Sequence, residues 1–433
     1  AGATLEGNAS SGATVRLLNL TVNGTYSATG GETIITGETG AGRAVDIVGT
    51  FTHNSGTLAI QTPADTLLRW PSSSSAYHLR INNASCIARP TGDNKPLIAG
   101  NLTISAGEFN TLEGGQDHAL TVTGKTEITT GTLTLNASTC LFNSGGTAGG
   151  LVLNANATVL ADADSTVTMG SIEAAYDSSI NIRLAGTNTI NNYRSSTDKT
   201  MKLPPGVVDP ASSTTSFTVT TSATNTEVSA VNLVDLTFTP ASGTPNFNLD
   251  SGYGGIDIEG NITISAGVTI TTNNQPFTIG KQCNLAGTLV CGTTDVSVAS
   301  GLADGTGTLG MRLQSGGTLT GGSGDHTYGT FNADASGTIS VTLTSGITTI
   351  NGSYTDGIAW GMRNGPTFSN GGGDIHFTGT ANQYLYERNN TARTLADVVV
   401  NKSSGTLQWY NSGGAHYTMA SLSIDSGTYT SVE

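Results

Sequence analysis

The sequence contains little charge and few aromatic residues. Charged side chains make up 11% of the 433 residues and aromatic side chains 6%, whereas glycine alone occurs 58 times. Such a composition leaves little material for the thick apolar core of ordinary globular domains. The 31 acidic and 17 basic residues give a net charge of −14, without any basic patch. We therefore expect no nucleic-acid binding, because binding to phosphates requires clustered Lys and Arg.

Long apolar runs and helical spacing are also missing. No apolar run approaches the roughly 20 residues of a transmembrane helix, so we expect no membrane span. Apolar residues instead alternate with polar ones in short runs, as at Leu18, Leu20 and Val22, and the runs end at Gly, Asn or Ser-Gly. This period of two is typical of strands, and the chain is predicted to be nearly all β.

Cysteine is rare, with four residues at positions that fit neither a disulfide framework nor a CxxC metal site. Their spacing is typical of small buried hydrophobic residues. Cys283 and Cys291 flank a turn at Gly287, so a disulfide between these two remains the alternative. The other two are Cys86 and Cys140.

One motif recurs at a fixed interval along the chain. Residues 100–107 read GNLTISAG, residues 260–267 GNITISAG and residues 420–427 ASLSIDSG, so the interval is the same both times (260 − 100 = 420 − 260 = 160). Within a copy, a shorter motif ending in glycine recurs at a much smaller interval, from Gly107 to Gly131 (131 − 107 = 24) and from Gly267 to Gly287 (287 − 267 = 20). An interval of this smaller size is typical of one coil of a β-solenoid.

The predicted fold is therefore all-β: an elongated parallel β-helix (β-solenoid) with about 20–24 residues per coil and a superrepeat near 160 residues. We expect one continuous solenoid over residues 1–433. Inward positions such as Ile264 take apolar residues, outward positions take Thr, Ser and Asn, and corners take Gly and Asn. Neither end shows a cap, which predicts continuation in a longer polypeptide or end-to-end assembly. The expected repeat copies are residues 1–30 (partial), 31–190, 191–350 and 351–433 (partial).

Binding in a solenoid usually involves segments that differ between otherwise matching coils. Two such segments are residues 193–206, which are polar and Pro-rich, and residues 354–365. Later strands carry aromatic residues in alternation, and aromatic faces can stack on sugar rings or anchor a protein partner. Drift of exposed loops and an internal aromatic ladder are the structural alternatives. The candidate surface-binding residues are Tyr193, Lys199, Trp360, Tyr384, Tyr386, Trp409 and Tyr410.

Signals for a metal or for catalysis are weak. Asp162 and Asp164, and the glycine-rich residues 321–325, leave calcium as the one candidate cofactor, although exposed turns explain both segments. No GxSxG motif, catalytic triad or phosphate loop is present. Glycoside cleavage requires two converging carboxylates, and no carboxylates show a pairing pattern. We therefore expect a non-enzymatic protein without assigned catalytic residues. The carboxylates considered for cleavage are Asp162, Asp177, Asp374 and Glu387.

At residues 100–107 and at residues 120–139 (LTVTGKTEITTGTLTLNAST) the sequence resembles two groups of repetitive β-solenoid proteins. These are the appendage proteins of tailed bacteriophages, often marine, and surface adhesins of the filamentous-haemagglutinin type. The resemblance implies a structural or adhesive fibre, a tail or head fibre of a virion, located outside the cell or on the virion surface.

The same resemblance implies which partners such a fibre would have. They are other copies of the chain, as a homotrimer or an end-to-end filament, and a glycan or protein of the host surface. The alternatives are a bacterial extracellular filament or adhesin, and a tailspike-like polysaccharide depolymerase.

Overall fold

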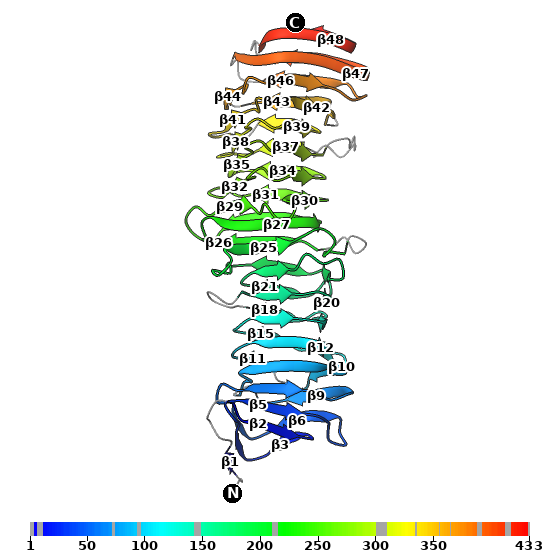
Figure 1. Ribbon diagram of the computed structural model, residues 1–433. Helices are drawn as coiled ribbons and strands as arrows, with labels where there is room; N and C mark the ends of the chain where they lie inside the picture. The colour runs from blue at the N-terminus through cyan, green and yellow to red at the C-terminus, as the bar shows by residue number, and fades with distance from the viewer. Residues whose placement is uncertain are drawn as a thin grey trace. The chain divides into compact units, whose positions relative to one another are not determined.

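The computed structural model describes residues 4–6, 12–71, 74–92, 97–142, 149–209, 215–299, 310–333, 336–354, 356–363, 365–387, 392–411 and 417–431. Every regular element among them is a strand (Figure 1). The strands pair in parallel from one turn to the next, apart from one short hairpin and one isolated bridge. The fold is thus an all-β parallel β-solenoid, as predicted. Within these described ranges, no helix is long and apolar enough to cross a membrane.

The chain divides into two compact units, unit 1 (residues 1–217) and unit 2 (residues 218–433), and each is a solenoid in its own right. One continuous solenoid over the whole chain stays a prediction, as do the boundaries of the repeat copies. The predicted end positions, Ala1 and Glu433, lie outside the described residues.

In unit 1 each turn contributes to three sheet faces, 1A, 1B and 1C. Face 1A contains β2 (Thr14–Leu17), β5 (Glu32–Ile35), β8 (Thr57–Ile60), β16 (Thr126–Ile128), β19 (Leu151–Leu153), β22 (Ile172–Ala174) and β25 (Lys199–Leu203). Face 1B contains β3 (Leu20–Val22), β6 (Arg43–Ile47), β9 (Asp65–Arg69), β17 (Gly131–Thr134), β20 (Ala157–Ala161) and β23 (Asn181–Leu184). Face 1C contains a separate three-stranded sheet of β1 (Thr4–Glu6), β4 (Thr25–Ser27) and β7 (Thr50–Thr52), and then β11 (Leu97–Ile98), β15 (Leu120–Val122), β18 (Thr139–Phe142), β21 (Thr166–Met169) and β24 (Thr187–Ile190). Two longer strands, β10 (His78–Pro90) and β12 (Leu102–Asn110), bend from face 1A into face 1B.

Unit 2 has three corresponding faces, 2A, 2B and 2C. Face 2A contains β29 (Asn246–Leu249), β32 (Thr269–Thr271), β35 (Thr288–Val290), β38 (Thr318–Thr320), β41 (Ser340–Thr342) and β44 (Thr367–Ser369). Face 2B contains β30 (Ile256–Ile258), β33 (Phe277–Ile279), β36 (Val296–Val298), β39 (His326–Tyr328), β42 (Thr348–Ile350) and β45 (Ile375–Phe377). Face 2C contains β28 (Leu236–Pro240), β31 (Ile262–Ile264), β34 (Gln282–Leu285), β37 (Gly310–Leu313), β40 (Phe331–Ala333), β43 (Ile358–Met362) and β46 (Gln383–Glu387). The longer β27 (Thr226–Leu233), β47 (Arg393–Asn411) and β48 (Tyr417–Ser431) contribute to more than one face, and β26 (Phe217–Thr221) includes the boundary between the units.

Strand register gives the length of a turn directly. Leu79 pairs with Leu102, a step of 23 (102 − 79), and Ile262 pairs with Cys283, a step of 21 (283 − 262). Both steps lie within the range predicted from the sequence. Cys283 pairs next with Met311, a step of 28 (311 − 283), so some turns are longer.

The core of each unit is a column of inward side chains from successive turns. In β31, Ile262 and Ile264 are 0% exposed, while Thr263 between them is half-buried. The inward position predicted for Ile264 is therefore confirmed. Burial of one such side chain contributes roughly 1.5–3 kcal/mol, so stability is distributed over many similar contacts.

The recurring motif at residues 100–107 and 260–267 has a structural reason at its first two positions. A Cβ at Gly100 would lie 2.5 Å from the carbonyl oxygen of Tyr77, and a Cβ at Gly260 would lie 2.3 Å from that of Val234, so the preceding turn excludes any side chain there. The following Asn101 accepts a hydrogen bond at Oδ1 from the backbone N–H of Lys125, at 2.9 Å. Its side chain thereby satisfies a corner amide of the next turn.

One protruding element was not anticipated. Strands β13 (Leu112–Glu113) and β14 (Gln116–Asp117) form an antiparallel hairpin at a corner of unit 1. Gly114 and Gly115 make its turn with φ of 58° and 79°. Two consecutive glycines between short runs are a hairpin signal, so the sequence did contain the information.

All four cysteines are free and buried. Burial raises the pKa of the Cys291 thiol to about 12. A disulfide between Cys283 and Cys291, the alternative left open by the sequence, is absent from this structure. Cys283 lies in β34 on face 2C and Cys291 follows β35 on face 2A, so each packs as a small core residue of its own face.

Candidate functional site

The first predicted binding segment, residues 193–206, consists of a short turn followed by strand β25 and a second turn. Lys199 begins β25, which pairs with β22, and its carbonyl oxygen accepts a hydrogen bond of 2.8 Å from the N–H of Arg194. The guanidinium of Arg194 forms an ion pair with Glu173 at 3.0 Å. Tyr193 is half-buried beside this short turn. The segment is therefore attached to unit 1 on both sides rather than extended as a free loop.

The prediction that Trp360 is a surface-binding residue is wrong. Trp360 lies in β43, all five residues of which are buried, and is itself 0% exposed. Its ring stacks on Phe331 of the preceding turn, with centroids 4.8 Å apart and planes 20° apart. On the outward side of β43, Ile358 lies in register with Tyr384 and Gly361 with Tyr386 of the next turn. Large side chains of that next turn can therefore cover it.

Three other candidates do come together, on face 2C of unit 2. Tyr386 and Tyr410 are register partners in β46 and β47, and their ring centroids are 5.6 Å apart with planes at 19°. Tyr384 lies two residues before Tyr386, with its ring 6.4 Å from that of Tyr410. Tyr410 is 51% exposed and the other two are half-buried. We call Tyr384, Tyr386 and Tyr410 the tyrosine face.

Glycines beneath the rings determine how the tyrosine face lies on the sheet. Gly361 places no side chain under Tyr386, and a Cβ at Gly357 would lie 2.2 Å from the Tyr384 ring. Aromatic rings commonly pack over glycine on a neighbouring strand in this way. The guanidinium carbon of Arg363 lies 4.6 Å from the centroid of Tyr386, within cation–π distance. The surface thus combines flat aromatic area with one positive charge.

Trp409 does not belong to the tyrosine face, although it directly precedes Tyr410. It is the register partner of the buried Leu385, and therefore points inward, where its ring packs on Tyr417 with centroids 4.9 Å apart. Trp409 is half-buried. Its alternation with Tyr410 explains the separation, because neighbouring residues of a strand point to opposite sides.

Carboxylates proposed for calcium or for glycoside cleavage lie in ordinary structural positions. Asp325 accepts a hydrogen bond at Oδ1 from the N–H of Ile347 at 2.8 Å, which makes the glycine-rich segment a corner of the solenoid. Asp177 accepts hydrogen bonds from Ser179. Glu387 points inward and pairs with Arg393. Among the described residues, no three His, Cys, Asp or Glu side chains form a metal-binding group. Calcium binding stays a prediction.

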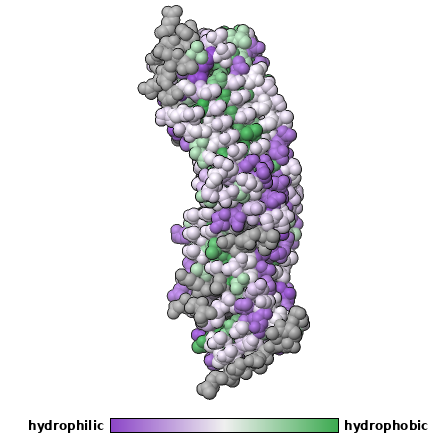
Figure 2. All heavy atoms as spheres, turned by 90° about the vertical axis from the view of Figure 1, so that its left-hand side faces the viewer, coloured by the Kyte–Doolittle hydropathy of each residue, from purple (hydrophilic) through white to green (hydrophobic). Residues whose placement is uncertain are grey.

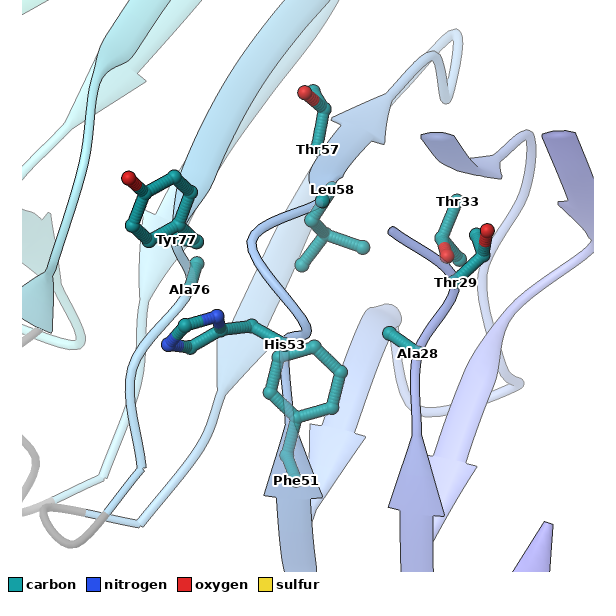
Figure 3. Close-up of a pocket in the computed structure, with 10 residues that line it drawn as sticks. Ala28, Thr29, Thr33, Phe51, His53, Thr57, Leu58, Ala76 and Tyr77 are labelled. Atoms are coloured by element: carbon teal, nitrogen blue, oxygen red, sulfur yellow. The ribbon is translucent and has the colours of Figure 1, made fainter. Parts of the chain in front are cut away.

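Unit 1 contains a small cavity between turns, shown in Figure 3. Phe51, His53 and Tyr77 lie along one side of it, with the rings of His53 and Tyr77 stacked at 5.1 Å. Its volume is about 10 Å³, which is enough for roughly one water molecule. Burial, and then the neighbouring His53, lower the pKa of His78 beside it. The cavity is too small for an organic ligand.

Both histidines here accept a backbone hydrogen bond at Nδ1: His53 from Ser55 and His78 from Asn101, each at 3.0 Å. In the neutral form the proton of each ring therefore lies on Nε2, which disfavours metal binding by that atom.

No protein-family model matches this chain, and no curated protein or solved structure matches it either. The resemblance to phage appendages and haemagglutinin-type adhesins therefore stays a prediction, and the tyrosine face has to be interpreted from its own geometry.

Proposed function

We propose that the protein is a non-enzymatic structural and adhesive fibre, a virion appendage, whose tyrosine face binds a glycan of the host surface. A parallel β-solenoid supports this role because its stacked strands present flat, regular outer faces. The observation that carries the proposal is the nearly parallel pair of Tyr386 and Tyr410 on consecutive turns, 5.6 Å apart. Sugar rings stack on such aromatic faces, and tyrosine hydroxyls can bond to sugar hydroxyls.

Binding to a panel of immobilised bacterial surface polysaccharides tests this proposal. We expect the wild-type chain to bind at least one of them, and the double variant Tyr386→Ser/Tyr410→Ser to bind at least ten-fold more weakly. Tyr176→Ser is the matched control, because Tyr176 is a 69% exposed tyrosine of unit 1 outside the tyrosine face. Equal binding by the double variant and the wild-type chain would exclude the tyrosine face as the adhesive surface.

Location and assembly are tested separately. We expect antibodies against unit 2 to label an appendage on virions in negative-stain micrographs. We also expect the purified protein to form a homotrimer or end-to-end filaments. Labelling of filaments on bacterial cells instead would favour the alternative of an extracellular filament or adhesin. Loss of viscosity in polysaccharide solutions would contradict the non-enzymatic part of the proposal.

A further inference from the structure

The ladder of face 2A is interrupted at one place in unit 2. Strand β44 pairs with β41 of the preceding turn, but no strand pairing joins it to the start of β47 among the residues described there. The neighbouring β45 and β46 do pair with β47. Two side chains span the interruption instead: Arg393 donates from Nη1 to the carbonyl oxygen of Pro366 at 2.8 Å, and Asn370 donates from Nδ2 to that of Thr394 at 3.4 Å.

A depression of about 450 Å³ opens at this interruption, lined by Pro366, Phe368, Asn370, Arg393 and Thr394 among others. Its volume lies within the range of small-ligand sites. Figure 2 faces the side of unit 2 on which Figure 1 labels β41 and β44, and hydrophobic colour reaches the surface there in small areas surrounded by polar atoms. The lining of the depression itself combines the ring of Phe368 with polar residues.

Two charged side chains lie in the core next to the depression. Phe368 is the register partner of the inward Val341, yet it remains half-buried because the next turn does not close over it. The inward positions that follow are occupied by Glu387 and Arg393, whose side chains are 1% and 3% exposed. Arg393 Nε donates to Glu387 Oε2 at 2.8 Å. Of this ion pair, Arg393 lines the depression and Glu387 is its buried partner.

This ion pair leaves one donor and one acceptor without a partner. Glu387 Oε1 and Arg393 Nη2 are both buried and form no hydrogen bond. Buried groups without a hydrogen bond call for an explanation, and a bound ligand is one. A hydroxyl group can satisfy both atoms, because it donates to the carboxylate and accepts from the guanidinium. Since the pair is neutral as a whole, it suits an uncharged ligand better than an acidic one.

We propose that this depression binds one neutral sugar unit, with the ring against Phe368 and a hydroxyl bonded to Glu387 Oε1 and Arg393 Nη2. The site is separate from the tyrosine face and deepens the proposed glycan binding, on which its biological role rests. Both polar atoms are closed to solvent in this structure, so binding requires a side-chain movement at the rim. Asn370 and Thr394 line the same depression.

The test is saturation-transfer NMR of the full chain with glucose, galactose, N-acetylglucosamine and galacturonate, each titrated separately. We expect saturable binding of at least one neutral sugar in the millimolar range and weaker binding of galacturonate. Phe368→Ala should weaken binding at least ten-fold. The double variant Glu387→Met/Arg393→Met should do the same while it keeps the fold, because apolar residues of similar size often replace a buried ion pair without loss of stability.

The tyrosine double variant is the matched control, since it should retain the monosaccharide affinity of the wild-type chain. No saturable binding of any neutral sugar, tighter binding of galacturonate, or unchanged affinity in the methionine double variant would each overturn the proposal. If monosaccharides fail while polysaccharide binding still depends on the tyrosines, this site is refuted and the proposed function stands.

Discussion

Lys402 donates a hydrogen bond from Nζ to Oε1 of Gln383 at 2.8 Å inside the core of unit 2. Both side chains are 1% exposed. Gln383 in turn donates from Nε2 to the carbonyl oxygens of Ile350 and Gly352, at 3.2 and 3.0 Å. Lys402 also donates to the carbonyl oxygen of Thr378 at 3.3 Å. Burial lowers the pKa of Lys402 to about 8, because these neutral acceptors replace water only in part.

This lysine predicts a rise in stability at alkaline pH. Between pH 8 and its ordinary value of 10.5, the unfolded chain holds a proton that the folded chain has released. Lys402 should therefore contribute an increase in the free energy of unfolding across this window, by up to the order of 3 kcal/mol, whereas the buried thiols of Cys140 and Cys291, whose pKa is raised, contribute a decrease. Lys402→Met should remove the increase, as measured by urea unfolding at pH 7.5 and 10.5. Lys281→Met, at an exposed lysine of the same unit, is the control that should keep it.

His326 predicts a loss of stability at acidic pH. Its ring is 0% exposed, its Nδ1 lies 2.9 Å from the hydroxyl of Tyr328, and burial lowers its pKa to about 4. Because the unfolded chain takes up a proton near pH 6.5 and the folded chain does not, stability should fall between pH 6.5 and 4, by on the order of 3 kcal/mol. The midpoint temperature of thermal unfolding should depend less on pH across this range in His326→Phe than in the wild-type chain. In His376→Gln, on the outward side of face 2B, it should depend on pH as it does in the wild-type chain.

Because inward and outward residues alternate in β31, the same substitution should have very different effects at two neighbouring positions. Ile264→Asp places a charge in the core and should destabilise the surrounding turns by about 3–5 kcal/mol. Limited proteolysis should then cleave unit 2 near this strand. Thr263→Asp, one residue earlier and half-buried on the outward side, should leave the protease pattern unchanged. Wild-type resistance in the Ile264 variant would contradict its inward position.

We expect the cysteine thiols to be unreactive toward alkylating reagents in the folded state. Burial raises the pKa of Cys140 and Cys291 to about 12, so almost no thiolate is present at pH 8. Iodoacetamide should label all four cysteines only after denaturation, as counted by mass spectrometry. An added Ser323→Cys in an exposed turn should be labelled in the folded protein. Rapid native labelling of Cys291 would show that unit 2 opens locally.

The sequence alone was enough to predict the solenoid and its turn length, because period-two alternation and the regular recurrence of the glycine motif both result from stacking. Ile264 was placed correctly for this reason. Trp360 was not, because residues 358–362 lack alternation and resemble a variable loop. The outward side of this strand is buried by the pair of tyrosines one turn later; Gly361 and its register partner Tyr386, for example, are 25 positions apart (386 − 361).

The tyrosine face was only partly predictable. Alternation placed Tyr384 and Tyr386 on one side, but the register that selects Tyr410 rather than Trp409 depends on the length of the intervening turn. The depression at Phe368 had no sequence signal at all. Glu387 was considered only as a carboxylate for glycoside cleavage, and nothing in the sequence indicated that it pairs with Arg393 in the core.

Because each turn bonds only to its two neighbours, unit 2 has an unusual mechanical character. Tension applied along its axis loads the outermost turn first, and the remaining turns keep their own contacts when that turn detaches. A single turn, such as the step from Leu385 to Trp409 (409 − 385 = 24), releases roughly 80 Å of extended chain when it unwinds. Under load, unit 2 would therefore lengthen one turn at a time while its remaining turns stay folded.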